Sequence, residues 1–235
     1  MMPMHIPDGF LDAPTSIGAG VVAVGGLAVC LRRSDLAADD RLAPLAGLTS
    51  AFVFAAQMLN FPVAAGTSGH LLGGALAAIL VGPWLGAICV AVVLLVQCLL
   101  FADGGLSALG LNVVNMALVS ALGGFAIFLG LRAVLPRTRG AVVVASGIAA
   151  GLGVVLASLA FTVEYALGGT GGASVATVAR AMVGVHVLIG IGEGVITALV
   201  VSAVLASRPD LVHGTRDLVE APPPAERPES MVGAS

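Results

Sequence analysis

The sequence is short of charged residues, and this shortage excludes a water-soluble domain. Of its 235 residues, 10% are Asp, Glu, Lys or Arg, whereas 58% belong to the apolar set. A soluble domain carries about a quarter of its residues as charged side chains, so this chain lacks the polar surface that water requires. It is long enough for several bilayer crossings of about 20 residues each. The composition therefore predicts an all-α, polytopic transmembrane helical bundle.

Lysine is absent altogether, because all ten basic residues are Arg. A Walker A loop uses a Lys to reach the terminal phosphates of ATP, so any ATP-driven step requires another subunit to bind the nucleotide. The net charge of −3 gives no sign of nucleic-acid binding. The three cysteines lie in apolar runs without C-x-x-C spacing, which is typical of small buried side chains. We therefore expect neither an enzyme nor a nucleic-acid-binding protein.

Seven apolar segments predict about seven helices. They cover residues 15–31, 42–59, 68–81, 83–101, 107–131, 141–167 and 175–206. The third is short, and Gly82-Pro83 separates it from the fourth by a tight turn. We expect one transmembrane bundle over 15–207, preceded by an extracytoplasmic metal-binding segment at 1–14 and followed by a disordered cytoplasmic tail at 208–235.

The distribution of arginine predicts the orientation in the membrane. Nine of the ten lie within 32–41, 132–139 and 208–227, and seven crossings place these three regions on one side; Arg180 lies on the other. The positive-inside rule makes the shared side the cytoplasm. The N-terminus is then outside and the C-terminus cytoplasmic, as expected for a multi-pass protein of a bacterial inner membrane.

Two histidines, far apart in sequence, predict a metal site at the outer face. His5 precedes the first helix and His70 begins the third, so the topology places both on the outer side. If translation begins at Met4, its free amine, the His5 amide nitrogen and the His5 imidazole form two fused chelate rings, and His70 supplies a fourth nitrogen. Four nitrogens suit Ni(II) or Cu(II), and Co(II) is also plausible. The residues at 1–3 depart from this arrangement, because within a peptide bond the Met4 nitrogen is a poor ligand.

Several sequence blocks carry a family resemblance. They are Met-His-Ile-Pro-Asp-Gly-Phe-Leu at 4–11, Gln-Met-Leu-Asn-Phe-Pro-Val at 57–63, Gly-Thr-Ser-Gly-His-Leu-Leu-Gly at 66–73 and Phe-Ala-Asp-Gly-Gly-Leu at 101–106, together with Gln97 and Asn112. Over residues 4–206 the chain resembles the CbiM/NikM family, the cobalt/nickel substrate-binding (S) components of energy-coupling factor (ECF) transporters, which belong to the ABC class.

The resemblance implies a seven-helix S component with the N-terminal segment folded into the bundle from outside. It implies Met4 (amine), His5 (amide nitrogen and imidazole) and His70 (imidazole) as ligands of transported Co(II) or Ni(II), without a prosthetic group. It also implies protein partners, namely a transmembrane coupling (T) subunit, two ATP-binding subunits and often a small accessory membrane subunit. The lipid bilayer surrounds the chain itself.

Other polar residues within the apolar segments need partners, because a charge at the centre of a bilayer costs about 2.5–3.5 kcal/mol on insertion scales. Gln57 and Asn60 either hydrogen-bond the ligand imidazole or join helices. His186 and Glu193 share one face of the last helix. They serve either in structural pairing or in coupling or metal passage. Asp103 is expected in an outer loop, solvated or capping a helix.

Three other interpretations remain open at this point. Gly-Thr-Ser-Gly at 66–69 also fits the pattern of rhomboid-type intramembrane serine proteases, with Ser68 as nucleophile and His186 as base. An autonomous metal channel would need a path of carboxylates, and Glu193 is the one deep acid. An S component for a different small substrate, such as a vitamin, leaves the histidine pair without a purpose.

Overall fold

The computed structural model describes residues 5–34, 40–58, 61–64 and 67–215. Met4 and Asn60 lie outside this part of the chain. In chain order the elements are α1 (Ala13–Arg33), α2 (Leu42–Gln57), β1 (Phe61–Ala64), β2 (Thr67–Gly69), α3 (Gly74–Val81), α4 (Pro83–Phe101), α5 (Leu109–Asn112), η2 (Val113–Gly123), α6 (Gly124–Val134), α7 (Arg139–Gly168), α8 (Val175–Ser207), η3 (Pro209–Leu211) and η4 (His213–Thr215).

Over the described residues, the predicted all-α bundle of about seven helices is confirmed. The elements α5, η2 and α6 follow one another without a break and form a single rod over Leu109–Val134. Its middle, Val113–Gly123, is a π-helix of 11 residues, a rare form that is frequent at functional sites. Five helices are long and apolar enough to cross a membrane, so the chain is a multi-pass membrane protein.

The third predicted helix is shorter than its apolar segment. Residues 67–69 pair with 61–64 in an antiparallel hairpin, and α3 begins only at Gly74. Gly73 adopts a φ of +74°, a left-handed conformation that glycine tolerates and that starts the helix in the middle of the bundle. The chain therefore enters the bundle in extended form before α3 begins.

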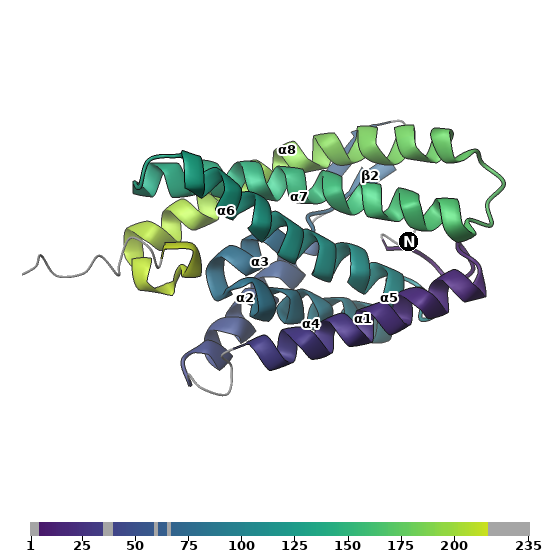
Figure 1. Cartoon of the computed structure of the whole chain (residues 1–235), viewed down its shortest axis with the longest axis horizontal. Helices are drawn as coiled ribbons and strands as arrows, with labels where there is room; N and C mark the ends of the chain where they lie inside the picture. Colours follow the sequence, from purple (N-terminus) through teal and green to yellow (C-terminus); the bar gives the residue numbers. More distant parts are fainter. Residues whose placement is uncertain (1–4, 35–39, 59–60, 65–66, 216–235) are drawn as a thin grey trace, which may run out of the picture.

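In the described part of the chain, the arginine-rich regions lie at one end of the bundle, as predicted. The end of α1, the start of α2, the α6–α7 connection and the C-terminal turns all lie at this end (Figure 1). Arg41 and Arg208 line the same pocket there. The guanidinium of Arg33 lies 5.1 Å from the centre of the Trp84 ring. The start of α1 and the α7–α8 connection lie at the opposite end.

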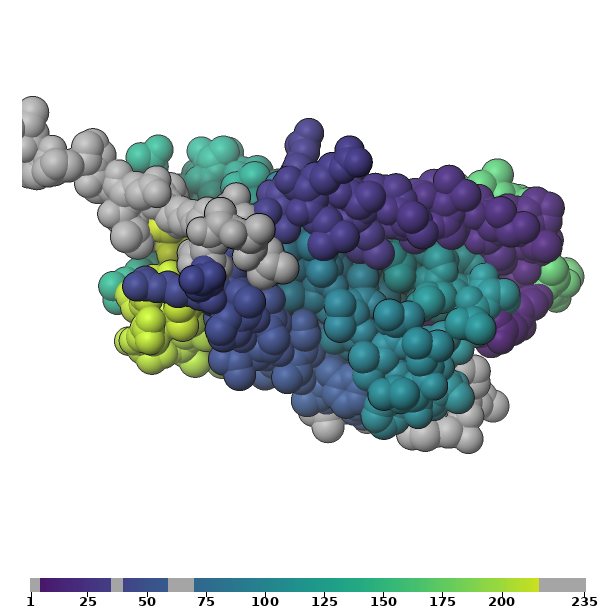
Figure 2. All heavy atoms as spheres, turned by 90° about the horizontal axis from the view of Figure 1, so that it is seen from below, coloured from purple at the N-terminus to yellow at the C-terminus, as the bar shows by residue number. Residues whose placement is uncertain are grey.

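Helix α1 lies along the outside of the bundle (Figure 2). Of its 21 residues, only Ala23 and Cys30 are buried. Many of its exposed side chains are large and apolar, and the same is true of α4, α7 and α8. A polypeptide surface of this composition is suited to lipid rather than to water.

The C-terminal boundary differs from the prediction. Residues 208–215 are folded, because they form the short helices η3 and η4. Val212 belongs to a core cluster with Phe125 and Phe128, and Thr215 is buried. The rest of the predicted tail, 216–235, lies outside the described residues.

Candidate metal site

The N-terminal segment is held inside the bundle by backbone-directed hydrogen bonds. The amide of Ile6 donates to Oδ1 of Asn112 at 3.0 Å, and Nδ2 of Asn112 donates to the Ile6 carbonyl at 3.3 Å. The same carbonyl accepts from the amide of Gly105 at 2.9 Å. Two residues further on, the Asp8 carboxylate accepts from the amide (2.7 Å) and the hydroxyl of Ser107. These contacts fix the segment against α5 and the loop before it, and they determine the position of His5.

The His5 imidazole is buried next to Asp103. Its Nδ1 lies 3.4 Å from the Asp103 carbonyl oxygen and 3.4 Å from the carboxylate Oδ2, while its buried Nε2 has no hydrogen-bond partner among the described residues. Burial lowers the pKa of His5, and the charge and backbone contact of Asp103 oppose that shift. A lowered pKa favours the neutral imidazole, which is the form that binds metals.

Gly104 makes room for this ring. It has a φ of +90°, and a Cβ built on it would lie only 2.9 Å from Cβ of His5. The sequence predicts that Asp103 is solvated or caps a helix. In the structure its side chain is only 10% exposed and lies beside His5.

His70 lies in the extended stretch between β2 and α3, and two buried side chains satisfy the backbone that follows it. The Glu193 carboxylate accepts from the amides of Leu72 (2.6 Å) and Gly73 (2.9 Å). Gln57 donates from Nε2 to the Leu72 carbonyl at 2.7 Å, while no hydrogen-bond partner of its Oε1 occurs in the described part of the chain. Glu193 and Gln57 therefore act on the backbone after His70. These hydrogen bonds differ from the bond to the imidazole ring that was considered for Gln57.

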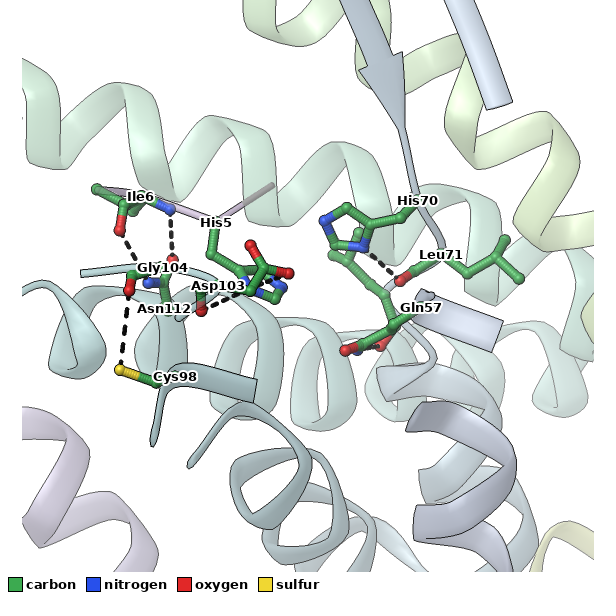
Figure 3. Close-up of polar contacts among 10 residues, drawn as sticks. His5, Ile6, Gln57, His70, Leu71, Cys98, Asp103, Gly104 and Asn112 are labelled. Atoms are coloured by element: carbon green, nitrogen blue, oxygen red, sulfur yellow. Dashed lines mark hydrogen bonds and ion pairs between the residues drawn. The ribbon is translucent and has the colours of Figure 1, made fainter. Parts of the chain in front are cut away.

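The structure brings His5 and His70 together. Their ring centres are 5.0 Å apart and the ring planes cross at 82°. Figure 3 shows the two imidazoles approaching each other, one from the N-terminal segment and the other from the extended stretch that follows β2. Both rings line a cavity of about 340 Å³, and so does His186 of α8. Chain segments far apart in sequence thus place three imidazoles around one cavity.

A metal site here needs more than side chains. Within the described ranges, no three His, Cys, Asp or Glu side chains lie close enough together to hold a metal ion. Two imidazoles provide two nitrogens, so a four-nitrogen site requires backbone or terminal nitrogens of the kind that Met4 and His5 offer. The side chain of Ser68 lies outside the described part of the structure, although its backbone belongs to β2.

Residues 5–211 match the family model CbiM, described as the cobalt uptake substrate-specific transmembrane region. The chain belongs to this family. It is 35% identical over 217 residues to the cobalt transport protein CbiM of Sorangium cellulosum, covering 89% of this chain and 94% of that one. It is 43% identical over 210 residues to an Archaeoglobus fulgidus protein provisionally named as the fused nickel transport protein NikMN, covering 89% of this chain and 68% of that one.

A solved structure agrees with the CbiM assignment. A crystal structure of a transition metal transporter superposes with a TM-score of 0.77 at 33% identity, covering 86% of this chain and 93% of that chain. The family resemblance is therefore confirmed. The serine protease alternative gains no support from any of these similarities.

The role of one residue beside the histidine pair was missed by sequence reasoning, and a second residue was assigned another role. Asn112 holds Ile6, and Asp103 contacts His5. Asn112 was noted only as part of the resemblance. The signal that could have identified this role is an Asn near the start of a long apolar segment. Such an amide is buried in the bundle and needs hydrogen-bond partners.

Proposed function

We propose that this chain is the substrate-specificity subunit of an ATP-driven, ECF-type cobalt/nickel uptake transporter. It captures the divalent ion at the outer face through the Met4 amine, the His5 amide nitrogen and imidazole, and the His70 imidazole. The observation that carries the proposal is the buried pair of His5 and His70, with ring centres 5.0 Å apart. Co(II) or Ni(II) is the transported substrate in this proposal, and no prosthetic group takes part.

The hydrogen bonds around the two rings support ligand roles for both. Nδ1 of His70 lies 2.9 Å from the Leu71 carbonyl, a contact that requires a proton on Nδ1 and leaves Nε2 as the metal-binding nitrogen. Fused chelation through His5 uses Nδ1, the ring nitrogen closer to the backbone. That atom lies 3.4 Å from two Asp103 oxygens, a long distance for a hydrogen bond. Asp103 thus orients His5 before the metal arrives, and metal binding at Nδ1 requires the ring proton to move to Nε2, which has no other partner among the described residues.

The expected partners are a transmembrane coupling subunit, two ATP-binding subunits and a small accessory membrane subunit. The absence of lysine supports this division, because this chain has no Walker A loop of its own. The arginine-rich end faces the cytoplasm in this proposal, which places the outer half of the bundle and its histidine pair outside. In its coupled state, the transporter opens the chain inward to release the ion.

The test compares Co(II) and Ni(II) binding by two purified forms in detergent, one beginning at Met4 and one retaining residues 1–3. We expect tight binding by the Met4 form, with loss of binding in both His5→Ala and His70→Ala. Equal binding by the two forms would remove the terminal amine from the ligand set. The proposal would be overturned if neither of the two forms bound the metal. It would also be overturned if His5→Ala and His70→Ala each kept the metal binding of the Met4 form.

Ser68→Ala separates this function from the protease alternative. A metal-binding subunit keeps its metal after this change, because the hydroxyl is not a ligand. Loss of a peptidase activity in Ser68→Ala, measured on a transmembrane peptide substrate, would instead support an intramembrane serine protease.

A further inference from the structure

The third imidazole of the cavity, His186, has no role in the four-nitrogen site. It lies on α8 and lines the same 340 Å³ cavity as His5 and His70. Yet the three histidines do not form a group tight enough to hold one ion, because no such group occurs among the described residues. His186 is thus a separate imidazole on the wall of the chamber that leads to the proposed site.

The His186 ring is held in the state that binds metals. Its Nδ1 lies 2.7 Å from the carbonyl of Met182, one turn earlier on α8. A carbonyl accepts a hydrogen bond and cannot donate one, so Nδ1 carries a proton, and in the neutral ring Nε2 then has the free lone pair. This is the ring's single hydrogen bond among the described residues. A fixed, neutral imidazole with one free nitrogen is a monodentate ligand for Co(II) or Ni(II).

The cavity is large enough for an ion that is still hydrated. Six waters at roughly 30 Å³ each occupy about 180 Å³, about half of the 340 Å³ of the cavity. Its walls also offer an acceptor for such waters. Oδ1 of Asn115 is buried and has no hydrogen-bond partner within the described ranges, and Asn115 lines the cavity from the π-helix η2. An unsatisfied buried acceptor of this kind costs free energy unless water or a ligand meets it.

We infer that His186 is a transient ligand for the incoming divalent ion, which it holds in the cavity before the ion passes to His5 and His70. The ion enters as a hydrated cation, Nε2 of His186 displaces one of its waters, and Asn115 accepts a hydrogen bond from another. Transfer then exchanges His186 for the nitrogens of the final site. No oxidation state changes, and the displaced waters leave through the cavity. This inference rests on the proposed function and adds a residue to its loading path.

A ligand that acts only along the path changes rates without changing the equilibrium. We therefore expect His186→Gln and His186→Ala, in the form beginning at Met4, to lower the association and dissociation rate constants of Ni(II) by the same factor, about tenfold. The dissociation constant should change by less than about threefold, which is at most ~0.7 kcal/mol. Stopped-flow mixing with Ni(II), and displacement by excess chelator, measure the two rates.

Two further variants make the outcome specific. Asn115→Leu should slow loading in the same way but less, whereas His213→Ala, at the opposite end of the bundle, should leave both rates unchanged. Unaltered or faster rates in both His186 variants would overturn the inference. So would loss of equilibrium binding with an unchanged melting temperature, because His186 would then belong to the final site. Failure of the unsubstituted form beginning at Met4 to bind metal would instead refute the proposed function.

Discussion

The His5 side chain lies against Gly104, where the absence of a side chain leaves the space that Cβ of His5 needs. A Cβ at position 104 would lie 2.9 Å from Cβ of His5. We expect Gly104→Ala to displace His5 and to weaken Ni(II) binding at least tenfold, measured by titration calorimetry. Gly172→Ala is a matched control, because Gly172 also has a positive φ but has open space around it. Equal affinities for the two variants would show that the space beside His5 is unimportant.

Glu193 fixes the chain after His70 through two backbone amides. A Gln at this position keeps one acceptor but directs an NH₂ group at the second amide, so one buried donor loses its partner. We expect Glu193→Gln to lower the free energy of unfolding by roughly 1–3 kcal/mol and to weaken metal binding through movement of His70. Chemical denaturation and calorimetry test both effects.

Ser146→Ala provides the comparison for Glu193. The Ser146 hydroxyl is buried and donates to the Val142 carbonyl of its own helix at 2.7 Å, so its loss should leave metal binding unchanged. If Glu193→Gln lowered stability without any effect on binding, the role of Glu193 in positioning His70 would be wrong.

At the residue level, the sequence was sufficient to predict the meeting of His5 and His70. Their motifs and the topology placed both on one side of the membrane. The actual targets of Gln57 and Glu193 were not predictable, because they are main-chain groups of an extended stretch. A pattern of side chains does not reveal which backbone amides lack helical partners.

Among the helices, α7 and α8 pack with a close approach of their backbones at facing glycines. A Cβ on Gly151 would lie 2.8 Å from the Gly190 carbonyl oxygen, and one on Gly190 would lie 2.7 Å from the Gly151 carbonyl oxygen. This packing allows the two helices to touch without intervening side chains, as small residues do in membrane bundles. The abundance of glycine predicted close packing, but the pairing of these two positions depends on helix register.

Two alanine substitutions on α8 test this contact between helices. Gly190→Ala should lower the free energy of unfolding by about 1–3 kcal/mol, because the new methyl group overlaps the α7 backbone. Gly184→Ala meets nothing within 4 Å and should leave stability unchanged or raise it, since Ala is the better helix former. Thermal unfolding in one detergent measures both variants. The same loss of stability in both would contradict the assigned packing.

The start of α3 shows where the sequence prediction of a helix fails. The apolar run at 68–81 favoured a helix throughout, yet only Gly74–Val81 is helical. The preceding residues stay extended because β1 pairs with β2 and because Glu193 replaces the helical acceptors for Leu72 and Gly73. The hairpin is local, but the Glu193 contacts span 121 and 120 residues of the chain, and local periodicity contains no information about them.

Over the whole molecule, the C-terminal turns close one end of the bundle. Val212 is 2% exposed and packs in a core cluster with Phe125 and Phe128. We expect Val212→Ala to lower the free energy of unfolding by roughly 1–3 kcal/mol, measured by denaturant titration. Val134→Ala serves as control, because Val134 is 80% exposed. Equal stability of the two variants would mean that residues 208–215 do not stabilise the bundle.

The proposed function requires the N-terminal segment and the third apolar segment to supply nitrogens to one ion inside the bundle. X-ray absorption of the Ni(II)-loaded chain beginning at Met4 measures this coordination directly. We expect four nitrogen ligands, with the scattering of two imidazole rings in the wild type and of one ring in any metal retained by His70→Ala. A site made mainly of oxygen ligands would contradict the proposal. An imidazole contribution that persists unchanged in both His5→Ala and His70→Ala would contradict it as well.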